Sequence, residues 1–206
     1  MELSSGLVVL TILIFSAILH EVAHGFVAEK LGDPTARLMG RLTLNPIKHI
    51  DPMMSILLPI IMWISTQGQF VFGAAKPIPV DPFNLRDGRK DMAIVALAGP
   101  LTNILIAILA SLLLNLLGQT AIAPLLYTTA TLNLLLAIFN LLPIPPLDGS
   151  KVFSLILPEK EARTYLSLGS IGMFIIFFLL LFPIGGFSLG EFVFQLLNFS
   201  KNLLGL

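Results

Sequence analysis

The sequence contains no cysteine. No disulfide can form, and no metal site in this chain can use a thiolate ligand. A transition metal would therefore have to be held by imidazole and carboxylate groups. The chain has three histidines and twelve acidic residues from which such a site could be built.

Charged residues are scarce, at 12% of the chain, which is about half the share of a soluble domain. The net charge is zero and no block of basic residues occurs, so nucleic acid binding is not indicated. Long runs carry no charge at all, and about 20 apolar residues can cross a bilayer as a helix. We expect an all-α, multi-pass membrane protein in the lipid bilayer, folded as one domain over residues 1–206.

About five transmembrane helices are expected, with a core over residues 3–157 and C-terminal helices over residues 164–206. The predicted helices cover residues 3–29, 92–117, 125–142, 164–184 and 187–206. No Lys or Arg precedes the first apolar run, so a cleaved signal peptide is disfavoured and we expect this segment to be retained.

Lys and Arg occur in the loops at 30–50, 67–90 and 143–163, but not at 118–124 or 185–190. This bias places the basic loops on the cytoplasmic side. Residues 53–65 are too few for a span, so we predict that 53–80 enters the membrane and returns. Within it, residues 69–80 are expected to be extended, because prolines lack amide donors and disfavour helix before them.

The most informative stretch is His20-Glu21-Val22-Ala23-His24, near the charged end of the first apolar run. Helical spacing puts His20 and His24 on one face, where both can bind one ion, and Glu21 can hold a water beside it. Such ligands suit Zn²⁺. The alternative is a structural cluster, but three ionisable groups at membrane depth usually mark function.

Two histidines leave zinc short of one protein ligand if a fourth position holds water. Asp148 is the best candidate, because it follows a helix in a proline-rich turn at the same end of the molecule. By spacing alone, it could equally be a helix cap. The other candidates are His49, Asp33, Asp51 and Asp81, and His49 is more simply an interfacial histidine.

Two motifs together, His20-Glu21-Val22-Ala23-His24 and Asn140-x-x-Pro143-x-Pro145-x-x-Asp148-Gly149, resemble the site-2 protease family of intramembrane zinc metalloproteases. Gly99-Pro100-Leu101-Thr102-Asn103 is similar to that family's Gly-x-x-x-Asn segment, and residues 32–37 and 73–80 resemble stretches of its compact prokaryotic members. The resemblance covers most of residues 10–155. No PDZ insertion interrupts it.

The resemblance implies one zinc ion on His20, His24 and Asp148, with Glu21 as general base and Asn140 near the substrate carbonyl. The expected substrate is a transmembrane protein. We expect Gly73, Lys76 and Pro77, in the extended segment, to pair with it as an added strand; the alternative is a loop that only shields the site. Asn103 is expected to pack against a neighbouring helix.

A non-proteolytic protein that binds a divalent metal is the competing hypothesis, either a transporter or an inactive relative. A transporter should offer charged groups along several helices, yet residues 92–117, 125–139 and 164–184 contain no Asp, Glu, His, Lys or Arg. An inactive relative would usually lose the water-activating carboxylate, and Glu21 is present. A protease for soluble substrates is disfavoured because the motif lies within an apolar helix.

Overall fold

The computed structural model describes residues 3–65, 67, 73 and 75–206, and over these residues the chain is mostly helical. Three long helices form its centre: α1 (Leu3–Leu31), α4 (Gly88–Leu117) and α5 (Ala123–Asn140). The shorter helices are α2 (Thr35–Leu38), α3 (Leu58–Ser65), α6 (Asp148–Phe153), α7 (Glu159–Ser167), α8 (Gly169–Leu181) and α9 (Leu189–Leu204). Other helical turns cover Pro46–His49, Pro52–Leu57, Pro82–Asn84 and Ser154–Ile156.

The predicted helical class is confirmed, but the expected number of spans is not. Among the described residues, three helices are long and apolar enough to cross a membrane, namely Gly6–Leu31, α4 and α5. The pair α7 and α8 would make a fourth only if counted together, because a bend of 73° separates them. α9 has 16 residues, fewer than the roughly 20 that span a bilayer.

α8 lies directly against the proline-rich turn. At Gly172 on α8, an added Cβ would come within 1.8 Å of the Pro145 carbonyl oxygen. Glycine at this position therefore permits the close approach of α8 to the turn.

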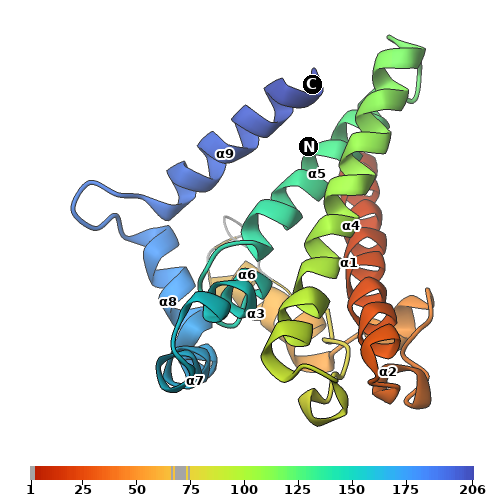
Figure 1. The fold of residues 1–206 in the computed structure, drawn as a ribbon. Coiled ribbons are helices and arrows are strands. Elements are labelled where there is room, and N and C mark those ends of the chain that lie inside the picture. The colour runs from red at the N-terminus through yellow and green to blue at the C-terminus, as the bar shows by residue number, and fades with distance from the viewer. Residues whose placement is uncertain (1–2, 66, 68–72, 74) are drawn as a thin grey trace.

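α4 lies at the centre of the molecule and packs against α1, α5 and α6 (Figure 1). Small residues fill these contacts, and Ala107, Ala130 and Ala137 are at most 1% exposed. Small side chains let membrane helices approach closely and gain van der Waals contact, because lipid is as apolar as the side chains themselves. Large apolar residues such as Leu105 and Leu112 point outward, as expected for helices that face hydrocarbon.

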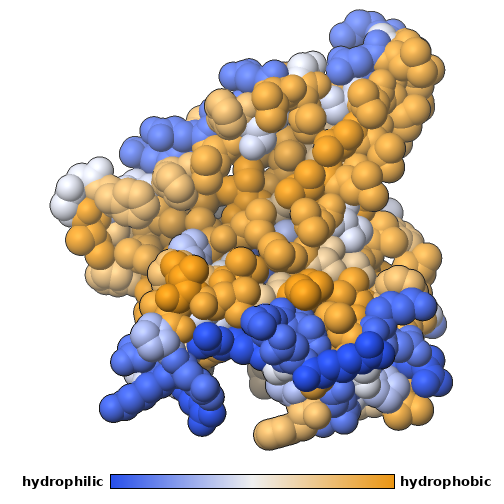
Figure 2. All heavy atoms as spheres, viewed as in Figure 1, coloured by the Kyte–Doolittle hydropathy of each residue, from blue (hydrophilic) through white to orange (hydrophobic). Residues whose placement is uncertain are grey.

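Hydrophilic residues gather along the lower edge of the molecule in Figure 2, where Figure 1 shows α2 and α7. α1 ends near this edge, and α4 begins there (Figure 1). Eleven of the twelve Lys and Arg residues lie in residues 30–50, 76–90 and 151–163. We call this side of the molecule the basic end.

The predicted strand over residues 69–80 is not confirmed. Residues 69–72 and 74 lie outside the described part of the chain. Residues 75–80 run without regular secondary structure, and the one β-bridge among described residues joins Ile184 and Phe187. Pro77 and Pro79 have no amide hydrogen, so this stretch offers few donors to a ladder.

Candidate metal centre

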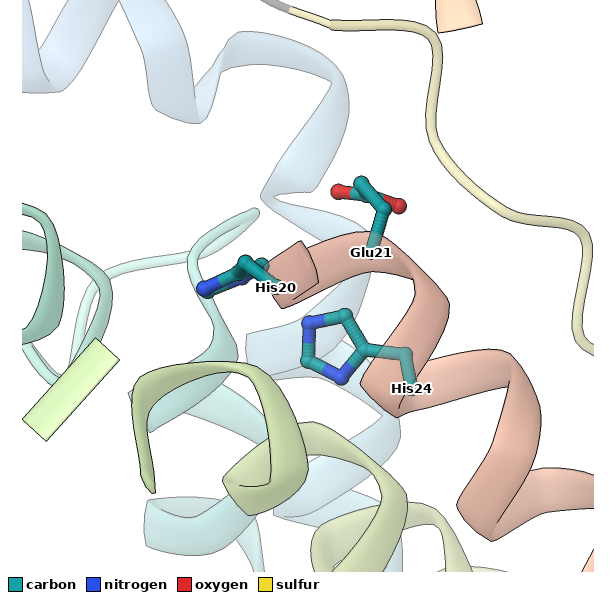
Figure 3. A group of neighbouring side chains, drawn as sticks. All are labelled: His20, Glu21 and His24. Atoms are coloured by element: carbon teal, nitrogen blue, oxygen red, sulfur yellow. The ribbon is translucent and has the colours of Figure 1, made fainter. Parts of the chain in front are cut away.

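His20 and His24 lie one turn apart on α1, with their ring centroids 4.6 Å apart and their planes nearly perpendicular. Both are buried, at 6% and 8% exposure. One potential ligand atom from each of His20, Glu21 and His24 lies within 4.8 Å of the others. Figure 3 shows the two imidazoles side by side, with the Glu21 carboxylate turned to another side of the helix.

Asp148 begins α6 and faces both imidazoles. Its Oδ2 lies 3.2 Å from Nε2 of His20 and 3.1 Å from Nε2 of His24. Two donor atoms that each lie 2.0–2.1 Å from a tetrahedral zinc ion are about 3.3 Å apart. The three donors therefore fit one zinc ion by both spacing and chemistry. Lys151 contacts the other oxygen, Oδ1, at 3.3 Å, which leaves Oδ2 for the histidines.

The charge state of Asp148 also suits a ligand. Burial raises its pKa, but the hydrogen bonds with His20 and His24 and the charge of Lys151 outweigh burial and hold the pKa of Asp148 below its usual range. The carboxylate is therefore ionised at neutral pH. A metal ligand has to be deprotonated, so no proton must be displaced from Asp148 when a metal binds.

Gly99 on α4 keeps the space beside the imidazoles open. A Cβ at this position would lie 2.5 Å from Nε2 of both His20 and His24. Any larger residue would push into the two nitrogens that face Asp148. The glycine thus permits α4 to pack directly against the histidine face of α1.

The second ring nitrogen of each histidine has a partner on α4. Nδ1 of His24 lies 2.7 Å from the carbonyl oxygen of Val95, and Nδ1 of His20 lies 2.6 Å from Oδ1 of Asn103. Such outer partners fix the ring orientation and tautomer of metal-binding histidines. The prediction that Asn103 packs against another helix was incomplete, because sequence spacing could not show that its oxygen meets His20.

The carboxylate of Glu21 faces residues 75–80, as Figure 3 shows, and its Oε2 accepts a 2.7 Å hydrogen bond from the amide of Ile78. Arg41 holds this segment from the other side: Nη2 donates to the carbonyl of Lys76 at 2.9 Å and lies 3.4 Å from that of Pro77. The Lys76 amide donates to the carbonyl of His49. The segment is therefore fixed to α1 beside Glu21.

The other candidate ligands are engaged elsewhere. Asp33 accepts hydrogen bonds from Thr35, Asn84 and the Asp81 amide, while Asp51 and Asp81 accept from Met53 and Phe83. His49 is buried rather than interfacial, and its Nε2 donates to the Thr43 carbonyl. Asn140 donates to the Leu136 carbonyl of its own helix. Gly73, Lys76 and Pro77 are exposed.

Comparison with known proteins decides the family. The sequence model of peptidase family M50 matches residues 115–183. The chain is 38% identical to YwhC of Bacillus subtilis, a proposed zinc metalloprotease, over 86% of this chain and 81% of that protein. The chain belongs to peptidase family M50. The predicted membership of the site-2 protease family is confirmed, and the chain is a zinc metalloprotease.

Other relatives agree with this membership. The chain is 32% identical to Rip2 of Mycolicibacterium smegmatis, also a proposed zinc metalloprotease, over 91% of this chain and 71% of that protein. It is 30% identical to a zinc metalloprotease of Methanocaldococcus jannaschii over 74% of this chain and 35% of the relative. No solved structure matches the chain with significance.

Proposed function

We propose that this M50 peptidase cleaves peptide bonds within or near transmembrane segments of membrane-protein substrates. The observation that carries the proposal is the meeting of Asp148 with His20 and His24 on a helix that is apolar enough to span a membrane. At 1.5 Å per residue, His24 and His20 lie about 9 and 15 Å along α1 from Lys30. A substrate peptide bond therefore has to reach a site below the membrane surface.

In this proposal His20, His24 and Asp148 hold the zinc ion. When bound, zinc makes water nucleophilic at neutral pH and polarises the substrate carbonyl. Glu21 accepts the proton of the attacking water and passes it to the leaving amine. Its contact with the Ile78 amide keeps the carboxylate in one orientation. Asn140 turns its amide from Leu136 towards the substrate carbonyl and helps to stabilise the developing negative charge.

The segment from Gly73 to Pro77 presents the substrate. A transmembrane helix hides its peptide bonds in its own hydrogen bonds, so it must be unwound before it is attacked. An extended segment beside Glu21 can supply replacement hydrogen bonds by pairing with the substrate. The exposure of Gly73, Lys76 and Pro77, and the anchoring of Lys76 by Arg41 and His49, support this role.

The chain acts as one domain of a prokaryotic inner or cell membrane, with the site nearer the cytoplasm and residues 53–80 re-entrant from that side. The support is the clustering of eleven Lys and Arg residues at the basic end, because cytoplasmic loops carry excess positive charge. His20 and His24 lie in the half of α1 that leads to this end.

The experiment uses the purified protein in liposomes with a model transmembrane substrate and with the same peptide made soluble by charged flanks. We expect cleavage inside or near the apolar segment, and much slower cleavage of the soluble peptide. The Glu21→Gln variant should keep its zinc but lose cleavage. Equal cleavage of both peptides would contradict the intramembrane role, and zinc-loaded protein with no cleavage of either would favour a metal-binding protein without protease activity.

A further inference from the structure

A buried polar chain leads from His20 across three helices. Asn103 Nδ2 donates to Asn133 Oδ1 at 2.8 Å, and Asn133 Nδ2 in turn donates to Ser16 Oγ and to the carbonyl of Thr129, both at 2.9 Å. Asn103 and Asn133 have no exposed surface. Buried amides in a membrane helix are costly unless paired, so a fully paired chain that ends on His20 calls for an explanation.

The carbonyl of Thr129 sets the direction of every bond in this chain. A backbone carbonyl can only accept, so Asn133 must turn its NH₂ group towards it. The Asn133 oxygen then faces Asn103, which must present its own NH₂ group there. The Asn103 oxygen is left facing His20, 2.6 Å from Nδ1. Nδ1 must therefore carry a proton, which leaves Nε2, the nitrogen beside Asp148, as the one that can bind a metal.

The reverse arrangement would fail at its far end. If Nδ1 of His20 carried no proton, both amides would have to flip, and the oxygen of Asn133 would then sit 2.9 Å from the oxygen of Thr129. Two acceptors at that distance repel each other and leave a buried group unpaired. His24 needs no such chain, because its Nδ1 meets the carbonyl of Val95 directly.

We propose that Asn133 is a positioning residue for the metal centre: acting through Asn103, it fixes His20 as the tautomer whose Nε2 is free to bind zinc. The inference rests on the proposed role of His20 as a zinc ligand. It assigns a function at the metal site to a residue of α5 that does not touch the histidine. The sequence motifs single out neither Asn133 nor Ser16.

The first test observes the ring nitrogens directly, by nitrogen NMR of ¹⁵N-histidine-labelled, zinc-loaded protein, because without zinc Nε2 of His20 and of His24 can carry a proton and donate to Asp148. The chain has only three histidines. We expect the proton on Nδ1 of His20 and His24, but on Nε2 of His49, because there Nε2 faces the Thr43 carbonyl. Single His→Gln variants assign the signals. A mixture of tautomers, or an Nε2 proton, at His20 in the wild type would overturn the proposal.

The second test uses two substitutions at Asn133. Asn133→Leu removes the acceptor, so Asn103 can flip, and zinc affinity measured by chelator competition should fall about tenfold to a hundredfold. Asn133→Asp, whose carboxyl group burial should keep protonated, can donate its O–H to the Thr129 carbonyl and keep an oxygen towards Asn103, so it should preserve both the His20 tautomer and near wild-type zinc affinity. Thr128→Val, which removes a bond to Pro124 on the same helix, is the control and should change neither property.

Two outcomes separate this inference from the proposed function. If His20→Ala abolishes zinc binding but Asn133→Leu leaves the tautomer and the affinity unchanged, the positioning role is wrong and the zinc site stands. If His20→Ala binds zinc as tightly as the wild type, the proposed ligand set fails first. If Asn133→Leu does not fold, the histidine tautomers of the wild type and the zinc affinity of Asn133→Asp still decide whether Asn133 positions His20.

Discussion

At the scale of single residues, the metal centre depends on the close approach of Gly99 to the two imidazoles and on the hydrogen bonds that orient them. Helical periodicity predicted that His20 and His24 would share a face, because that relation is local. The contacts of Asn103 and Gly99 with these rings could not be predicted, since they depend on how α4 is rotated against α1. Polar residues in apolar runs were the only sequence signal for the buried chain, and a packing role explained them equally well.

Gly99→Ala should impair zinc binding. Its added methyl group would lie 2.5 Å from both Nε2 atoms, so the imidazoles would have to turn away from Asp148. We expect zinc affinity to fall by on the order of tenfold to a hundredfold, the range found when groups that orient ligands are altered. Gly190→Ala is the control, because its nearest atom lies 3.8 Å away. Chelator competition measures the zinc affinity of both variants. An unchanged zinc affinity in Gly99→Ala would contradict the close approach of Gly99 to the imidazoles.

Asp33 should make stability depend on pH in acid. Burial raises its pKa, but hydrogen bonds from Thr35, Asn84 and the Asp81 amide outweigh burial and lower the pKa below 3.8. The ionised form of Asp33 therefore stabilises the fold above about pH 4. This stabilisation is lost as the pH falls through the pKa that Asp33 has in the folded protein.

Asp33→Asn is the matching variant, because its side chain cannot ionise. The Tm of Asp33→Asn should lie below that of the wild type at pH 6, and the two Tm values should converge as the pH is lowered and Asp33 becomes protonated in the folded protein. Thermal unfolding in detergent across this range measures the difference. A constant difference in Tm would show that ionised Asp33 does not stabilise the fold.

At the scale of elements, residues 75–80 are held by the side chains of Arg41 and Glu21 and by the backbone carbonyl of His49, in place of a β ladder. The prolines correctly predicted a non-helical stretch, since the lack of amide donors is a local property. The anchoring by Arg41, His49 and Glu21 was not predicted, because these partners come from distant parts of the sequence. The close approach of Gly172 to Pro145 was not predicted for the same reason, because it is a tertiary contact.

Arg41→Gln should lower kcat without removing zinc. Arg41 is 6% exposed and donates to the segment that carries the Ile78 amide to Glu21. Loss of the guanidinium frees the segment, so Glu21 loses its fixed orientation while the histidines and Asp148 are untouched. Cleavage rates and zinc content measure the two effects. Arg37→Gln, which breaks an exposed ion pair with Glu29, should leave both unchanged.

At the scale of the whole molecule, charge divides the protein into a basic end and an apolar body (Figure 2). The apolar runs predicted the three long helices closely, because length and composition determine which segments can span. The expected number of about five spans is not confirmed, because among the described residues a bend separates α7 from α8 and α9 has only 16 residues. The pairing of Asp148 with α1 arises only when α5 returns the chain to the end where α1 finishes.

The proposed orientation can be tested with single cysteines, because the chain has none of its own. Arg86→Cys lies at the basic end, and Gln119→Cys lies in the exposed turn between α4 and α5. In intact cells, a membrane-impermeant maleimide should label Gln119→Cys and leave Arg86→Cys unlabelled until the membrane is opened. The opposite pattern would place the basic end outside the cell.

The most direct test of the central claim is zinc-edge X-ray absorption of the purified, zinc-loaded protein. Two imidazole nitrogens and a carboxylate oxygen at about 2.0–2.2 Å are predicted, with one imidazole lost in His24→Ala and the carboxylate oxygen lost in Asp148→Ala. A zinc shell without imidazole, or one that is unchanged in both variants, would contradict the account.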